Sequence, residues 1–239
     1  MSKLLIEDKE VVIPGQILAE GMDYLPSNGA IREGDNIIST SMGVVSLSGR
    51  LIKIIPLTKR YVPQIGDVVV GFVKDLTYSS WFIDIGYSND AVLSMKDATS
   101  DFIERGADLT QYFSHGDYMV AKIANVTKTK AVDITMREPG LKKLYGGKII
   151  EVNPARVPRI IGKQGSMIKI IKDSTGCMIT VGQNGIIWLK GPDLKNELIA
   201  TEAIMRINEC SYTQGLTEQT EAFLKERTGG KQHGVHQEA

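Results

Sequence analysis

The sequence predicts a multidomain fold with an all-β amino-terminal module, a small β-barrel and an α/β domain. Its 239 residues exceed the length of about 100–200 residues that is usual for one domain. Short strand-like segments follow one another up to a Pro-Gly pair at positions 139 and 140, and strands mix with regular helical spacing only after it. We expect modules at 1–60, 61–140 and 141–212, a carboxy-terminal helix at 213–228 and a disordered tail at 229–239.

The composition is that of a globular protein, with 42% hydrophobic and 23% charged residues. No apolar run approaches the roughly 20 residues that span a bilayer, and the amino terminus MSKLLIEDKEVVIP has acidic residues where a signal peptide needs an apolar core. Cys177 and Cys210 fit neither a metal-ligand spacing nor a disulfide framework, and we interpret them as reduced, structural thiols. These observations predict a cytoplasmic protein without membrane association.

The charges are unevenly distributed along the chain. The totals balance at 28 basic and 28 acidic residues, but residues 141–175 contain 8 basic and 2 acidic residues. Residues 61–140 show the opposite bias, with 7 basic and 11 acidic residues. Local segregation of this kind indicates an electrostatic footprint for an anionic partner in the third module.

The first 140 residues read as short strands separated by turns. In the first module, apolar runs are bounded by PSNG, REGD and SGR, which is typical of small antiparallel sheets. In the second module, five strand candidates are YVPQIGDVVVGFV, WFIDIG, AVLSM, YMVAKIANVT and AVDITM, with a helix-bearing connection expected at 96–113. Five short strands with a helical connection predict a small barrel of the OB type.

The third module alternates strands and helices. GGKIIEVN, CMITVG and GIIWLKG have strand character, and QNG between the last two predicts a hairpin turn. SMIKIIKDST and PDLKNELIATEAIMRINEC have apolar residues at helical spacing. A further helix, TEQTEAFLKERT, is expected to begin with a Thr cap.

The sequence contains no recognisable catalytic set. A P-loop, a dinucleotide-binding glycine motif, a His-Glu-x-x-His pair and a nucleophile elbow are all missing. His115 precedes a turn into a strand, and we interpret it as a surface residue. We therefore expect no catalytic residues, no metal and no cofactor in this chain.

The segment RIIGKQG at 159–165 has features of a loop that holds a phosphate backbone. Gly162 and Gly165 lack a Cβ atom, so a sugar–phosphate chain can approach closely. The helix that follows exposes N–H groups and a partial positive charge at its start. Lys163 adds a charge at the tip, and Arg159 and Lys169 flank it. Because Gly-x-x-Gly occurs often by chance, an ordinary turn or a structural spacer is the alternative interpretation.

The order of elements around this loop resembles a KH domain. RIIGKQGSMIKIIKDSTGCMITVGQNGIIWLKG matches the KH pattern of helix, strand, turn and strand after the loop. In KH domains the Gly-x-x-Gly loop clamps four backbone nucleotides of a single strand. The resemblance implies RNA contact by Gly162, Lys163, Gln164 and Gly165, supported by Arg159 and Lys169.

The second module resembles the S1-type OB fold of RNA-binding domains. The resemblance lies in GDVVVGFVKDLTYSSWFIDIGYSNDAVLSM and GDYMVAKIANVTKTKAVDITM. Of the residues with which that family usually contacts bases, only one aromatic position is retained, as Phe82. Ser79, Ser94, Thr127 and Ala131 occupy the other positions. Since stacking contributes about 1–3 kcal/mol per base, we expect weaker base contact here.

Other residues of the second module leave two alternatives open. Tyr78 and Trp81 lie nearby as alternative stacking residues, whereas strand alternation favours burial of Trp81 beside its neighbours on the same face. Lys74 and a hairpin pair, Lys128 and Lys130, are candidate phosphate contacts, and the hairpin lysines are equally compatible with a solvated loop.

The domain order is more specific than any single motif. A β-rich module followed by S1-type and KH domains resembles the RNA-binding cap subunits of the archaeal exosome, as does the junction Tyr61, Pro63, Gly66 and Asp67. The resemblance implies a non-catalytic subunit, three copies of which sit on a hexameric ring of phosphorolytic subunits through the amino-terminal module. The cap would capture single-stranded RNA and direct it to the ring's pore for 3′-to-5′ degradation.

Two alternatives to a cap subunit differ in partners or activity. The first is a free-standing RNA-binding protein with S1 and KH modules and no ring partner. The second is an enzyme of the polynucleotide phosphorylase type, which carries its KH before its S1 domain and needs large catalytic domains that this sequence lacks.

Overall fold

The computed structural model describes residues 2–99, 103–104, 106–210 and 215–229. Contacts divide the chain into two compact units, Met1–Arg60 and Tyr61–Ala239, and each is described by itself. Among the described residues, no helix is both long and apolar enough to cross a membrane.

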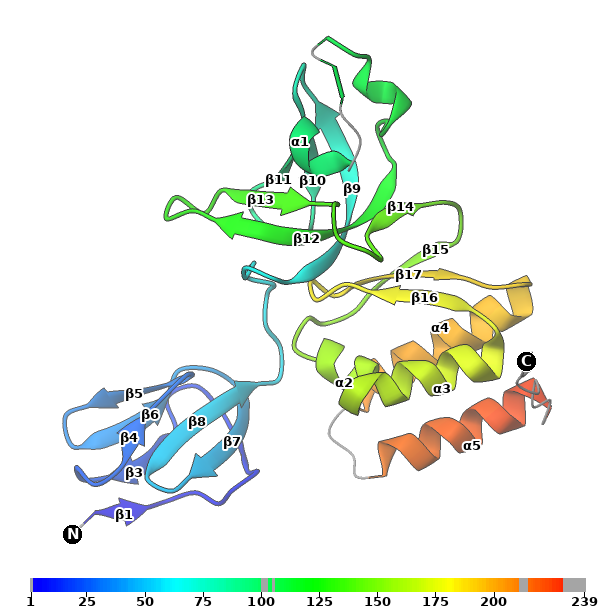
Figure 1. The fold of residues 1–239 in the computed structure, drawn as a ribbon. Coiled ribbons are helices and arrows are strands. Elements are labelled where there is room, and N and C mark those ends of the chain that lie inside the picture. Colours follow the sequence, from blue (N-terminus) through cyan, green and yellow to red (C-terminus); the bar gives the residue numbers. More distant parts are fainter. Residues whose placement is uncertain (1, 100–102, 105, 211–214, 230–239) are drawn as a thin grey trace. The chain divides into compact units, whose positions relative to one another are not determined.

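The amino-terminal unit contains two four-stranded sheets around one core (Figure 1). One sheet has the order β1-β3-β6-β5 (Lys3–Leu4, Ile17–Glu20, Asn36–Ser39 and Ala30–Glu33). The other has the order β2-β7-β8-β4 (Val11–Val12, Gly43–Ser48, Leu51–Pro56 and Leu25–Pro26). Strand alternation buries Ile37, Ile52 and Ile54 and turns their neighbours outward.

The second unit begins with a closed β-barrel. Its strands are β9 (Val68–Leu76), β10 (Ser80–Asp84), β11 (Ala91–Ser94), β12 (Tyr118–Val126) and β13 (Val132–Thr135). They follow the order β13-β11-β10-β9-β12, and pairing of β13 with β12 closes the barrel. A sixth strand, β14 (Lys142–Leu144), extends it beside β12. The OB-like barrel predicted from five strand candidates is confirmed.

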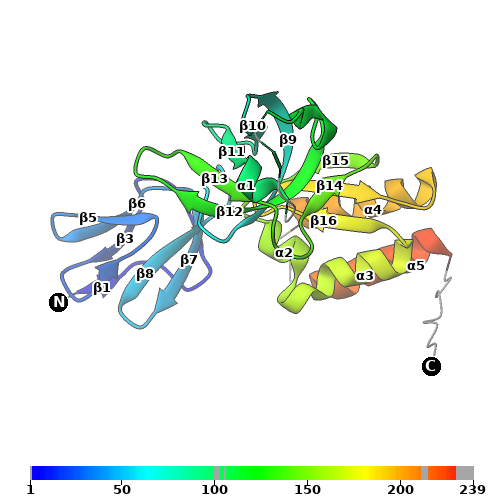
Figure 2. The same cartoon turned by 45° about the horizontal axis from the view of Figure 1, so that its top comes forward.

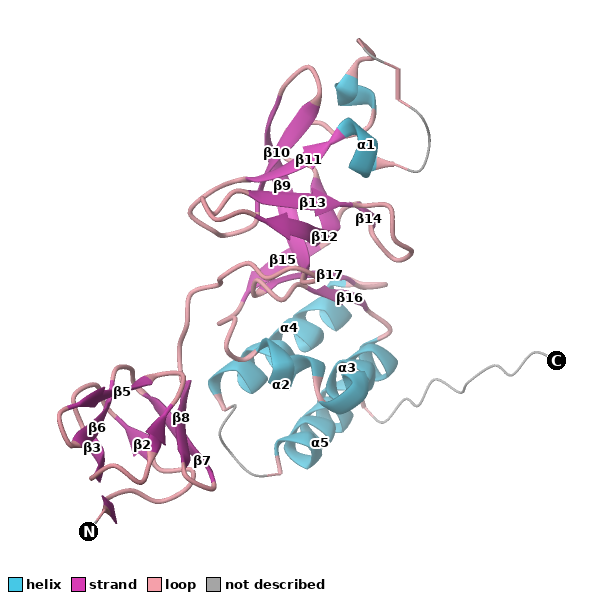
Figure 3. Ribbon diagram, turned by 60° about the vertical axis from the view of Figure 1, so that its left-hand side comes forward, coloured by secondary structure: helices cyan, strands magenta, loops and turns pink. Residues whose placement is uncertain are grey.

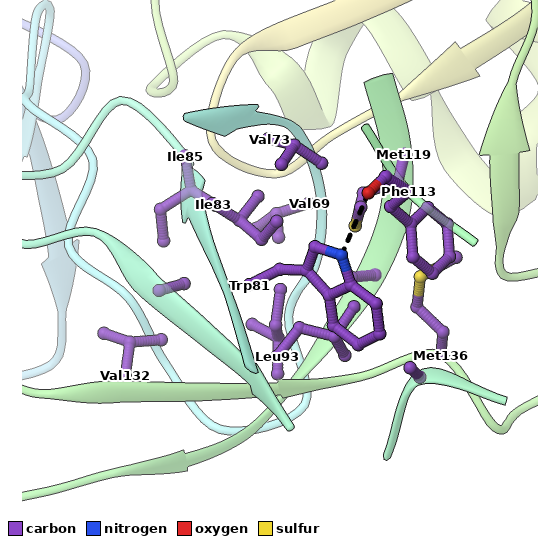
Figure 4. Close-up of a cluster of buried hydrophobic side chains, with 14 of the residues drawn as sticks. Val69, Val73, Trp81, Ile83, Ile85, Leu93, Phe113, Met119, Val132 and Met136 are labelled. Carbon is purple, nitrogen blue, oxygen red and sulfur yellow. Dashed lines mark hydrogen bonds between the residues drawn. The ribbon is translucent and has the colours of Figure 1, made fainter. Parts of the chain in front are cut away.

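Trp81 lies at the centre of the barrel core (Figure 4). Its side chain is fully buried, and its Nε1 donates a hydrogen bond to the carbonyl oxygen of Phe113 at 3.0 Å. The Phe113 ring meets it edge-on, with 5.4 Å between the ring centroids. Burial, the alternative that strand alternation favours, is therefore the role of this tryptophan, and its ring is not available to stack on a base.

The carboxy-terminal part is an α/β domain with its helices on one face of a three-stranded sheet (Figures 1 and 3). The sheet has the order β15-β17-β16 (Lys148–Glu151, Ile186–Lys190 and Met178–Val181). The helices are α2 (Val157–Ile161), α3 (Ser166–Thr175), α4 (Leu194–Glu209) and α5 (Leu216–Thr228). Figure 2 shows α3 and α5 side by side. Their apolar faces share a core with the sheet.

Two local expectations differ from the structure, and the apolar lead-in to the glycine loop forms the short helix α2. Within the described part of 96–113, only α1 (Met95–Ala98) and the 3-10 helix η1 (Leu109–Gln111) are helical. Helix α5 begins at Leu216 after Gly215, so the expected Thr cap is wrong. These are errors at element boundaries, where tertiary contacts outweigh local propensity.

The turn between β16 and β17 joins the α/β domain to the barrel. The Gln183 N–H donates a hydrogen bond to the Val68 carbonyl oxygen at 2.8 Å. In return, the Val68 N–H donates to the side-chain Oε1 of Gln183 at 3.1 Å. The buried Asn184 accepts from the Val70 N–H at 3.3 Å and donates to the carbonyl oxygens of Val70 and Ile85 at 2.7 and 2.9 Å. Strand β10 reaches β9 only from Phe72 onward, so this turn supplies the partner that the start of β9 lacks.

Asn184→Ala should lower the free energy of unfolding by about 3 kcal/mol or more. The substitution leaves one buried N–H and two carbonyl groups without partners, and each such group costs about 1–3 kcal/mol. Urea unfolding followed by tryptophan fluorescence would measure this free energy, since Trp81 lies in the barrel and Trp188 in the α/β domain. Asn89→Ala, at an exposed position, is the control and should change stability by less than about 0.5 kcal/mol. Equal effects of the two variants would contradict the assigned role.

Candidate nucleic-acid interface

The glycine loop between α2 and α3 has backbone angles that residues with a side chain rarely adopt. Gly162 ends α2 with φ +76°, and Gly165 precedes α3 with φ +79°. Between them, Gln164 also adopts a left-handed conformation with φ +53°. Three positive φ angles in four residues make a sharp protruding turn, because left-handed backbone reverses the direction of the chain.

The loop is held at its base and open at its tip. The Gly162 N–H donates to the Pro158 carbonyl at 3.0 Å, and the Gly165 N–H donates to the Gly162 carbonyl at 3.2 Å. A Cβ atom on Gly165 would meet nothing within 4 Å. The surface above Gly165 is therefore free for another backbone to approach.

Basic and apolar groups surround this loop. The side chains of Arg159, Lys163 and Lys169 are exposed, as is that of Gln164. Ile161 and Ile168 pack only partly against the domain core, so each leaves apolar surface beside the loop. The structure thus brings together all six residues that the sequence predicted in this domain. Positive charge next to apolar surface and open backbone suits a single-stranded polyanion with accessible bases.

The start of α3 adds to the positive field. No side chain of the described residues caps this helix end, and the first N–H groups of a helix carry a partial positive charge. An anion at the loop would meet these N–H groups and Lys163 together.

The predicted contacts on the barrel are more scattered, and acidic groups lie beside them. Phe82 is half-buried, and its cross-strand partners are Asp75 and Val92. Asp84 follows on the same strand face. Carboxylates on neighbouring strand positions repel phosphate, so the face around Phe82 is less favourable for RNA than the glycine loop.

Lys74 is already engaged in an ion pair. Its Nζ lies 2.9 Å from Asp90 Oδ2, and the hydrogen bond and charge of Asp90 raise the pKa of Lys74. Lys128 and Lys130 are exposed on the turn between β12 and β13, which a 3.0 Å hydrogen bond from Lys130 N–H to the Thr127 carbonyl closes. These two lysines are the accessible charges of the predicted barrel set.

The perturbed titratable groups give no acid–base catalyst among the described residues. Burial, then a hydrogen bond to Asp67, raises the pKa of Tyr61, and burial raises that of the Cys177 thiol. Hydrogen bonds from Thr110 lower the pKa of Asp108. For Asp117, burial is outweighed by hydrogen bonds from Lys143 and Ser114 and by the Lys143 charge, which lower the pKa. Every shift moves away from neutral pH, whereas catalysis needs a group poised near it.

Sequence reasoning does not predict two further features of this domain and its entry. The QNG pattern predicts a hairpin turn, but not that the Asn184 amide anchors that turn to the barrel. The second feature is the exposed Tyr145, at the turn between β14 and β15. An aromatic residue inside the basic run KKLYGGK was the available signal for the second feature.

Comparisons with known proteins agree with both domain assignments. Two family models match the chain, the S1 domain of RRP4 over residues 60–105 and the KH domain over residues 147–206. A crystal structure described as an exosome complex RNA-binding protein matches with a TM-score of 0.64 and 39% identity, over 71% of this chain and 97% of the other.

Curated relatives extend the similarity over the whole chain. The exosome complex component Rrp4 of Pyrococcus abyssi is 40% identical across 100% of this chain and 91% of that protein. Its counterpart in Thermococcus kodakarensis is 39% identical across 100% of this chain and 94% of that protein. Because identity at this level covers both domains and the amino-terminal unit, the chain belongs to the Rrp4 family of exosome complex components.

Proposed function

We propose that this chain is a non-catalytic cap subunit of a cytoplasmic exosome, which captures single-stranded RNA and directs it to the pore of a hexameric phosphorolytic ring. The observation that carries the proposal is the exposed, basic Gly-x-x-Gly loop between α2 and α3. It is supported by the name exosome complex component that the relatives carry.

The glycine loop is the main proposed RNA contact. Its backbone from Gly162 to Gly165 would approach the sugar–phosphate chain, while Lys163, Arg159 and Lys169 neutralise phosphates. The barrel contacts are secondary. Lys128 and Lys130 reach the phosphate chain from their hairpin, whereas Phe82 and Lys74 contribute less because Asp75 and Asp90 lie beside them.

The amino-terminal unit is the proposed anchor on the ring, with three caps on each ring. Two rows of outward-facing apolar side chains support this role. In one sheet, Val11, Val44 and Ile55 are cross-strand neighbours, and Val11 and Ile55 are 57% and 49% exposed. In the other sheet, Ile17, Ile38 and Ile31 form a similar row. Adjacent exposed apolar residues on a small module are typical of a protein–protein interface.

The charge of the loop can be tested directly. Replacing Lys163 and Gln164 together by Asp should weaken binding of a short unstructured RNA by about tenfold or more and reduce the slope of log K against log salt by about 0.7. Fluorescence anisotropy at several salt concentrations measures both. Lys195→Asp with Asn196→Asp on α4 changes the net charge equally and should have little effect. Unchanged affinity in the loop variant would make the KH domain a structural spacer.

The two loop glycines should respond differently to substitution by Ala. A Cβ atom on Gly162 would lie 2.6 Å from the Met167 backbone nitrogen, so Gly162→Ala should lower the free energy of unfolding by about 2–4 kcal/mol through left-handed strain and overpacking. Gly165→Ala has open space and should lower it by about 1–2 kcal/mol, while RNA affinity falls. Urea unfolding and anisotropy separate the two effects. An RNA affinity for Gly165→Ala equal to that of the parent would show that no backbone approaches there.

Anchoring on the ring predicts co-elution of this chain with the ring subunits. Ile55→Asp or Val11→Asp should weaken that association by about tenfold or more if the row is central to the interface, whereas Ser48→Asp, exposed on the same sheet, should not. Size-exclusion chromatography of mixtures measures it. A parent chain that elutes alone at matched concentrations would instead support a free-standing RNA-binding protein.

A further inference from the structure

We propose a second contact surface for single-stranded RNA at the turn between β14 and β15, centred on the ring of Tyr145. The Tyr145 surface consists of Tyr145, of Lys142 and Lys148 on the strands that flank its turn, and of Lys190, which contacts the turn's backbone. It deepens the proposed function and rests on RNA being the ligand of this chain. It does not depend on the glycine loop being a contact.

Tyr145 is exposed on a turn that is fixed at both ends. Its side chain is 66% exposed, although β14 pairs with β12 and β15 pairs with β17. Trp188 Nε1 donates to the Gly146 carbonyl at 2.6 Å. Gly147 has φ +79°, and a Cβ atom there would collide with the Leu189 carbonyl oxygen. A ring presented by an ordered turn loses little conformational entropy when a ligand binds.

Lysines lie beside the ring, at its backbone and on the strands that flank its turn. Lys143 Nζ lies 5.4 Å from the centroid of the Tyr145 ring, and Lys190 Nζ donates to the Tyr145 carbonyl oxygen at 3.1 Å. Lys142 and Lys148 are exposed on the strands that enter and leave the turn. Lys143 also pairs with Asp117. The other three lysines form no ion pair among the described residues, so their charges are available to a polyanion.

This surface is separate from the glycine loop. The sheet order is β15-β17-β16, so β15 and β16 are opposite edges. Helix α3, which follows the glycine loop, leads directly into β16, whereas the Tyr145 surface lies at the start of β15. Lys148 therefore lies at the start of β15 and Lys142 on β14 of the barrel, whereas Lys163 and Lys169 follow the opposite end of β15, beyond α2.

The chemistry favours single-stranded RNA over other anions. An exposed aromatic ring gains by stacking on a base, and only an unpaired base has an accessible face. A duplex offers phosphates to the lysines but no base face to the ring. Lysines on both sides of one exposed aromatic residue suit the phosphates and an unpaired base of one strand.

The test uses the full chain and a fluorescein-labelled, unstructured 20-nucleotide RNA in anisotropy titrations. Tyr145→Ala should weaken binding by at least about fivefold through loss of stacking, and Tyr145→Phe should restore it to within about twofold. Lys142→Gln with Lys148→Gln should reduce the slope of log K against log salt by about 1.4, for two lost phosphate contacts. Lys195→Gln with Lys225→Gln, both exposed on helices α4 and α5, is the charge-matched control and should leave the slope unchanged.

A duplex RNA of equal length gives the second arm. Tyr145→Ala should leave duplex binding unchanged while the lysine variant weakens it, because only the lysines contact phosphates. Single-stranded affinity of Tyr145→Ala equal to that of the parent, while the Lys163 and Gln164 variant still loses affinity, would overturn this inference and leave the proposed function standing. A parent chain that binds neither RNA would overturn both.

Discussion

The pairing of Gln183 and Asn184 with the start of β9 holds the barrel and the α/β domain together. Strand β9 pairs with β12 along one side, but β10 covers its other side only from Phe72 onward. The backbone groups of Val68 and Val70 are satisfied by the turn of another domain. Apolar contacts of Trp188 with Val70 and Val120 surround these bonds. A turn used in this way must keep its length and its amide side chains, because a buried N–H or C=O without a partner is strongly unfavourable.

The junction places an acidic barrel next to a domain with exposed lysines. The barrel carries an acidic excess and has its largest aromatic residue buried, whereas the α/β domain displays exposed lysines on its glycine loop, on α3 and at the start of β15. A zero net charge therefore conceals two regions of opposite sign. Because the junction joins the two domains through hydrogen bonds and apolar contacts, a polyanion meets them in a defined geometry. In the proposed function, the acidic barrel repels RNA and the exposed lysines of the α/β domain attract it.

The amino-terminal unit differs from the other two domains in having exposed apolar rows. Its core is small, and strand alternation leaves apolar rows on the outer faces of both sheets. The proposed function therefore assigns a polyanion to the basic loop and a protein surface to the apolar rows of the amino-terminal unit.

Local patterns in the sequence predict most of the elements and the charge that they carry. Alternating apolar residues predicted the barrel strands, and Gly-x-x-Gly with its basic flanks predicted the loop, because both depend on residues close together in the chain. Packing between separate elements is what buries Trp81, pairs Lys74 with Asp90 and brings Asn184 to β9. Those outcomes depend on residues up to 114 positions apart. Such contacts leave no local periodic signal, since they arise only when separate elements pack.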